Sequence, residues 1–157
     1  MRGPSRESAL LNPDFRDMLS IFNEEKVEYL VVGAYALAAY GNPRATKDLD
    51  LWIKCSEENA KKIVLALNRF GAPSSLIRTQ DFIKRGLTVQ IGVAPRRIDL
   101  VTEISGVTFE DAYPRHTNIE IEGVSVPIIG RQDLLLNKKA AGRPQDLADA
   151  SWLEAGE

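Results

Sequence analysis

The sequence has almost no sulfur or imidazole with which to build a disulfide or a soft metal site. Cys55 is its one cysteine and His116 its one histidine, so an internal disulfide and a site of several cysteines and histidines are both excluded. Any metal bound by this chain would therefore have oxygen ligands. The sequence also lacks the long apolar run that a signal peptide or a membrane span would require. We expect a reducing, cytoplasmic setting and no membrane partner.

The chain also lacks a large excess of either charge. Its formal net charge is −2, which gives no general electrostatic case for nucleic-acid binding. With 157 residues, of which 44% are hydrophobic and 27% charged, the composition predicts one globular domain with a substantial core. We expect a flexible N-terminus over residues 1–12 and a single domain over 13–157.

Apolar periodicity and turn residues divide this domain into helices and strands. Helices are predicted over 13–27, 34–40, 56–71, 131–142 and 146–156, and strands over 28–33, 47–54, 87–93, 96–104 and, as a hairpin, 118–130. Ser56 and Asp146 are the expected caps at the starts of two of the helices. Residues 72–86 are compatible with a short helix and a turn. The order of these elements predicts an α/β or α+β fold, with helices on one side of a sheet.

Three aspartates interrupt strands that are otherwise apolar. Asp48 and Asp50 share one strand face, about 7 Å apart along the strand, and Asp99 lies in the later strand RRIDLVT. If the two strands are neighbours, the three carboxylates converge. Carboxylates are ligands that Mg²⁺ prefers, and three of them can hold two ions ~3.5 to 4 Å apart for displacement at phosphorus.

The sequence also offers groups that could receive a phosphate. Gly33 lies where a strand turns into a helix, and a residue without Cβ lets a ligand approach the backbone N–H groups there. Arg44, Lys47 and Lys138 could neutralise a triphosphate. Together with the three acids, these residues indicate phosphoryl or nucleotidyl transfer.

This pattern resembles the DNA polymerase beta-like nucleotidyltransferase superfamily. The resemblance rests on the Gly33–Ala34 turn, the acid pair of the segment Asp48–Asp50, and Asp99 in RIDL. The C-terminal segment LLLNKKAAGRPQDLADA is similar to the tail of small bacterial nucleotidyltransferases related to AbiE-type toxins. The resemblance covers roughly residues 14–153.

The resemblance implies a mixed sheet with helices mainly on one side, and a reaction that moves NMP from an NTP to an acceptor hydroxyl. Asp48 and Asp50 would bind Mg²⁺ or Mn²⁺ together with Asp99, which would also activate the acceptor. Gly33 and Ala34 would hold the nucleotide phosphates. By analogy the acceptor is tRNA or protein, with an RNA end or a small molecule as alternatives, and a partner chain of a toxin–antitoxin pair would accompany the enzyme.

Several alternatives remain open at this level. By resemblance, Lys138 on the late helix supports catalysis or nucleotide binding, with Lys139 as its competitor. Ala34 replaces the usual Gly or Ser of the turn and removes any hydroxyl contact. Arg143 either binds phosphate or pairs with a nearby aspartate, and Trp52 either stacks a base or is buried beneath a helix. The same fold could also serve as a non-catalytic nucleotide-binding or antitoxin module.

Overall fold

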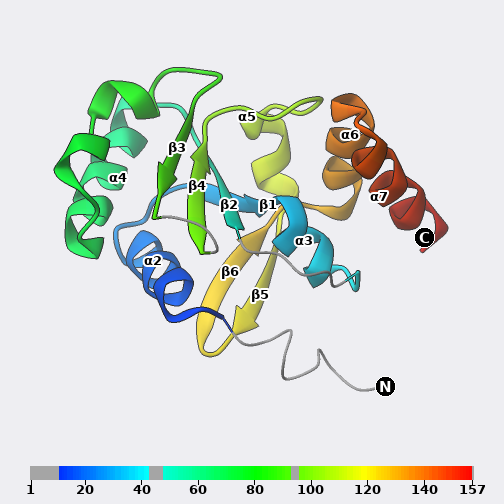
Figure 1. The fold of residues 1–157 in the computed structure, drawn as a ribbon, viewed down its shortest axis with the longest axis horizontal. Coiled ribbons are helices and arrows are strands. Elements are labelled where there is room, and N and C mark those ends of the chain that lie inside the picture. Colours follow the sequence, from blue (N-terminus) through cyan, green and yellow to red (C-terminus); the bar gives the residue numbers. More distant parts are fainter. Residues whose placement is uncertain (1–10, 43–47, 93–95, 157) are drawn as a thin grey trace.

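A six-stranded mixed sheet forms the centre of the molecule, as the computed structural model shows for residues 11–42, 48–92 and 96–156 (Figure 1). The strands lie in the order β3-β4-β2-β1-β6-β5. Their bounds are Tyr29–Val32 (β1), Asp48–Ile53 (β2), Thr88–Ile91 (β3), Arg97–Val101 (β4), Thr117–Ile121 (β5) and Val124–Ile128 (β6). The predicted α/β class and mixed sheet are confirmed. Arg44 and Lys47, expected near phosphate, lie outside the described residues, as does nearly all of the expected flexible N-terminus.

Helices connect and cover the strands. Their bounds are Pro13–Glu24 (α2), Gly33–Ala39 (α3), Glu57–Phe70 (α4), Phe109–Ala112 (α5), Arg131–Ala141 (α6) and Pro144–Ala155 (α7). Residues 72–86 contain two short 3₁₀ helices, η1 (Ser74–Leu76) and η2 (Thr79–Phe82), and a third, η3 (Tyr113–Arg115), follows α5. Within the described ranges, no helix has the length and apolar character needed to cross a membrane.

The pairing of the central strands sets the geometry of the site. Strands β2 and β4 pair in parallel, with Asp50 opposite Asp99. Strand β1 pairs with β2 in antiparallel orientation, with its last residue, Val32, opposite Asp50. Partners across a sheet point to the same face, so the two acids and the end of β1 come together at one point of that face.

The two faces of β2 differ in what covers them. Leu49, Leu51 and Ile53 are at most 1% exposed on one face and belong to the hydrophobic core. Trp52 shares the other face with the acids. It is 2% exposed, and its ring packs edge-on against Phe109 of α5 with centroids 5.2 Å apart. Burial beneath a helix, rather than base stacking, is therefore the role of this tryptophan.

The start of α7 corrects one sequence-based expectation. Asp146 was predicted to cap this helix, but α7 begins at Pro144 and Arg143 is the N-cap residue. Proline suits the first helical position because its missing N–H needs no partner there. Asp146 lies at the third helical position, where its Oδ2 accepts a hydrogen bond from the Arg143 backbone N–H at 3.3 Å. It thus supplies the reciprocal half of a capping box.

Candidate active site

The three predicted acids lie on two neighbouring strands, and they influence one another electrostatically. The pKa of Asp50 is raised to about 6, first by burial and then by the negative charges of Asp99 and Asp48. Like charges disfavour the ionised form of a carboxyl group. A cation placed among these acids would offset the repulsion between their negative charges.

Arg97 is a member of this group that the sequence reasoning did not single out. It is the first residue of β4 and lies opposite Asp48. Its Nε donates to Asp99 Oδ1 at 2.7 Å and its Nη2 to Asp99 Oδ2 at 3.1 Å. The same Nη2 donates to Asp48 Oδ2 at 2.9 Å. The alternation of strand side chains was the available signal, because Arg97 and Asp99 are two residues apart and share a face.

Gly33 makes the turn from β1 into α3 with a left-handed backbone, at φ +70°. A Cβ added at Gly33 would overlap Oδ2 of Asp50. Only glycine allows both this backbone conformation and the close approach of the carboxylate. The first turn of α3, with Ala34 as its second residue, thus lies directly beside the acids.

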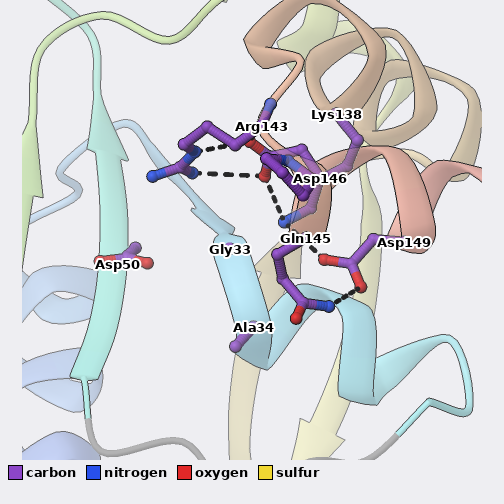
Figure 2. A pocket seen from close by; sticks show the side chains of 9 residues that line it. Gly33, Ala34, Asp50, Lys138, Arg143, Gln145, Asp146 and Asp149 are labelled. Carbon is purple, nitrogen blue, oxygen red and sulfur yellow. Dashed lines mark hydrogen bonds and ion pairs between the residues drawn. The ribbon is translucent and has the colours of Figure 1, made fainter.

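A cavity of about 510 Å³ opens on this turn, within the size range of small-molecule sites. It is lined by Gly33, Ala34, Asp50, Lys138, Arg143, Pro144, Gln145, Asp146 and Asp149. Figure 2 shows that Asp50 enters from β2, whereas Lys138 comes from α6 and the two aspartates Asp146 and Asp149 come from α7. The structure therefore combines the strand acids, the glycine turn and the C-terminal helices in one cavity.

The wall formed by α6 and α7 is itself a charged cluster. Lys138 is only 8% exposed, and its Nζ lies 3.2 Å from Asp149 Oδ2 and 3.6 Å from Asp146 Oδ1. Gln145 donates from Nε2 to Asp149 Oδ1 at 3.1 Å. Lys139, the competing lysine, is half exposed and forms an ion pair with Glu154, so Lys138 is the one of the two lysines that lines the cavity.

Arg143 connects this cluster to solvent. Its Nε lies 2.6 Å from Asp146 Oδ2, and this hydrogen bond is the main reason why the pKa of Asp146 is lowered. The Arg143 side chain is 77% exposed and also lines the cavity. Of the two alternatives for Arg143, the pairing with an aspartate is confirmed, within the first turn of α7 and not between two helices, while contact with phosphate remains a prediction.

The structure thus brings most of the predicted site residues to one region. Gly33, Ala34, Asp50 and Lys138 line the cavity, while Asp48 and Asp99 lie beside Asp50 and are bridged by Arg97. The cavity also includes Asp146 and Asp149, which the sequence reasoning considered only as a cap or as partners of Arg143. The sequence contained one signal for them, their spacing of three residues, which places both on one face of a helix.

The acids have the right donor atoms for a divalent cation, but Arg97 already uses some of them. Among the described residues, no three Asp, Glu, His or Cys side chains are arranged as a ready-made metal site. Even so, burial and, after it, the negative charges of Asp99 and Asp48 raise the pKa of Asp50 to about 6, although the charges of Arg97 and Lys138 oppose this rise. Hard oxygen donors with excess negative charge suit Mg²⁺ or Mn²⁺.

Several solved structures share the fold of this chain. A Thermotoga maritima protein assigned as a nucleotidyltransferase superposes with a TM-score of 0.58 at 15% identity, covering 96% of this chain and 97% of its own. The lincosamide antibiotic adenylyltransferase LnuA, in a lincomycin-bound structure, superposes with a TM-score of 0.57 at 14% identity, and the match covers 92% of this chain and 97% of LnuA. The antibiotic-resistance factor ANT(2'')-Ia superposes with a TM-score of 0.60 at 10% identity, and the match covers 91% of this chain and 82% of ANT(2'')-Ia. This chain therefore has the nucleotidyltransferase fold.

The sequence itself identifies the family. Residues 11–154 match the family described as "Nucleotidyltransferase of unknown function (DUF6036)", and this chain belongs to that family. No curated protein matches it. The superfamily resemblance read from the sequence is confirmed, whereas its AbiE-type branch remains a prediction.

Proposed function

We propose that this protein is a metal-dependent nucleotidyltransferase that moves NMP from an NTP to a hydroxyl group of an acceptor. The observation that carries the proposal is the placement of Asp50. It lies opposite Asp99, beside a glycine turn that excludes a side chain, and it opens into a cavity with Lys138. The chain's membership of a nucleotidyltransferase family supports this assignment of the reaction class.

In the proposed reaction, an oxygen of the acceptor forms a bond to the α-phosphorus of the NTP. The bond from that phosphorus to the bridging oxygen of the β-phosphate breaks, and pyrophosphate leaves with its electron pair. Asp99 accepts the proton of the attacking hydroxyl, directly or through water. The two other acids, Asp48 and Asp50, would hold Mg²⁺ or Mn²⁺, which supplies neutralisation of charge on the phosphate oxygens.

The remaining residues would position the nucleotide. The backbone N–H groups of Gly33 and Ala34 provide donors for phosphate oxygens. Lys138 adds a fixed positive charge on the far wall of the cavity, held in place by its ion pairs. Such groups raise the rate by holding the reactants in line and by stabilising charge that develops in the transition state.

For the acceptor we favour a hydroxylated small molecule. LnuA, an adenylyltransferase with lincomycin bound, matches this chain over 97% of its own length. A chain of about this length is therefore large enough for a small-molecule acceptor. The tRNA or protein acceptors and the toxin–antitoxin partner chain rest on the C-terminal sequence similarity alone, and the two macromolecular acceptors are tested in the same experiment.

The test is to incubate the protein with each of the four NTPs labelled at the α-phosphate, Mg²⁺, and separate pools of small metabolites, RNA and protein. We expect label in one pool with wild type, loss of at least about a thousandfold in rate with Asp48→Asn, and an unchanged rate with the exposed control Asp17→Asn. Binding of NTP without label transfer to any pool would contradict turnover and support the non-catalytic nucleotide-binding module.

A further inference from the structure

Arg97 contacts an oxygen of Asp48, which the proposed metal ion needs, and both oxygens of Asp99, the proposed proton acceptor. These contacts of its guanidinium are 2.7 to 3.1 Å long. A planar guanidinium matches a carboxylate in this two-pronged way and forms strong, charge-assisted hydrogen bonds. A divalent cation bound by Asp48 would compete with Arg97 for the oxygen of this carboxylate and would be repelled by the positive charge of the guanidinium.

The position of Arg97 follows from the sheet register and is not the result of a chance surface contact. Arg97 lies directly opposite Asp48 across the parallel strands β2 and β4. The next pair on the same face, two residues further along both strands, is Asp50 and Asp99. Its side chain is 29% exposed, whereas that of Asp99 is 10% exposed. The guanidinium therefore has access to solvent, so it can leave the acids without unfolding the strand.

We infer that Arg97 is an internal counter-ion of the acid cluster, which a divalent cation must displace in order to bind. This inference rests on the proposed function. In the metal-free protein Arg97 neutralises carboxylates that would otherwise repel one another. Its displacement lowers the affinity for the metal alone. A nucleotide would restore that affinity, because its phosphates offer the freed guanidinium a second two-pronged partner.

The experiment measures binding of Mn²⁺ alone, without nucleotide, from the signal of free Mn²⁺ in electron paramagnetic resonance. Arg97→Gln should bind Mn²⁺ about tenfold more tightly than wild type, because one opposing charge is removed and the carboxylate oxygens become available. Arg16→Gln, which removes an exposed arginine of α2, should match wild type. An affinity of Arg97→Gln equal to or weaker than that of wild type would overturn the inference.

Thermal unfolding provides a second measurement. In the presence of a chelator, Arg97→Gln should melt several degrees below wild type because its carboxylates are no longer neutralised. Saturating Mn²⁺ should then raise its melting temperature by more than it raises that of wild type. A variant that melts lower but gains no more from Mn²⁺ than wild type would show that Arg97 only positions the acids, and it would overturn the inference.

The same titrations separate this inference from the proposed function. Wild type should bind Mn²⁺ in the presence of a nonhydrolysable ATP analogue, and Asp50→Asn should not. If that result holds while Arg97→Gln behaves as wild type, the function stands and the counter-ion role fails. If neither wild type with the nucleotide analogue nor Arg97→Gln binds Mn²⁺, both proposals fail.

Discussion

Two charged clusters flank the glycine turn, and they differ in how their charges are balanced. In the strand cluster, which comprises Asp48, Asp50, Asp99 and Arg97, the arginine donates hydrogen bonds to Asp48 and Asp99, and Asp50 has a raised pKa. In the helix cluster, which comprises Lys138, Arg143, Asp146 and Asp149, two acids face two cations. The comparison concerns the described residues.

The balance of each cluster is reflected in its electrostatics. In the helix cluster, Arg143 lowers the pKa of Asp146. In the strand cluster, burial and neighbouring acids raise the pKa of Asp50 to about 6. Removing one partner of the buried ion pairs in the helix cluster would cost stability, whereas a carboxylate with a raised pKa gains from a further cation. The helix cluster therefore forms a fixed wall, and the strand cluster is the place where a ligand adds charge.

The largest expected effect comes from breaking the balance of the helix cluster. Lys138→Met leaves Asp146 and Asp149 buried without their shared cation, and removing one partner of a buried ion pair costs about 3 to 5 kcal/mol. We expect the free energy of unfolding to fall by about 3 kcal/mol in urea titrations. Lys139→Met, at the half-exposed neighbour, should change it by less than about 0.5 kcal/mol. Equal losses would contradict a special role for Lys138.

A smaller effect is expected at the glycine turn between the clusters. Gly33→Ala places a Cβ against Asp50 and forces alanine into a left-handed backbone, at a combined cost of about 2 to 3 kcal/mol. The matched control is Gly71→Ala. Gly71 also has a positive φ, of +90°, but nothing lies within 4 Å of an added Cβ, so about 1 kcal/mol is expected there. Similar unfolding energies for the two variants would show that Asp50 does not depend on the absence of a side chain at Gly33.

The excess charge of the strand cluster predicts a variant that is more stable than wild type. In the presence of a chelator, Asp50→Asn should raise the free energy of unfolding by about 1 to 2 kcal/mol near pH 7, because it removes a carboxylate whose charge is disfavoured. The same variant should lose Mn²⁺ binding. A loss of stability near neutral pH would show that the negative charge of Asp50 is already compensated.

The pH dependence of this gain has a definite sign. The pKa of Asp50 in the folded protein, about 6, lies above its ordinary value of 3.8. As the pH falls through about 6, wild type takes up a proton in the folded state and recovers stability relative to the unfolded chain. The advantage of Asp50→Asn should therefore be largest above about pH 7 and shrink between about pH 6 and pH 4. An advantage that grows on acidification would contradict the raised pKa.

The smallest effect on stability is expected at Arg143, where the helix cluster meets solvent. Because its side chain is 77% exposed, Arg143→Gln should lower the free energy of unfolding by no more than about 0.5 kcal/mol. If this guanidinium also binds phosphate, the affinity for Mg²⁺-ATP measured by calorimetry should fall about fivefold. Unchanged affinity would restrict Arg143 to its pairing with Asp146.

The strand cluster could largely be predicted from the sequence, because its pattern is local. Alternation along a strand puts Asp48 and Asp50 on one face whatever the rest of the chain does. The same rule applied to RRIDL would have placed Arg97 beside Asp99. Arg97 gave a weaker signal than Asp99, because an arginine at the first residue of a strand is ordinary, whereas an acid inside an apolar strand is not.

The helix cluster was harder to predict, because it depends on contacts between distant segments. Lys138 reaches the cavity because α6 and α7 line it together with the turn at Gly33, and no local pattern specifies that placement. The start of α7 was misplaced by the preference of aspartate for N-cap positions. Pro144 was the competing signal, since proline favours the first helical position.

The most direct test of the central claim is a crystal of the protein grown with Mn²⁺ and a nonhydrolysable nucleotide, measured at a wavelength where manganese scatters anomalously. The account predicts an anomalous peak within about 2.2 Å of carboxylate oxygens of Asp48 and Asp50, with the guanidinium of Arg97 withdrawn from Asp48. A bound nucleotide with no manganese between the strand acids, and with Arg97 still bridging Asp48 and Asp99, would contradict it.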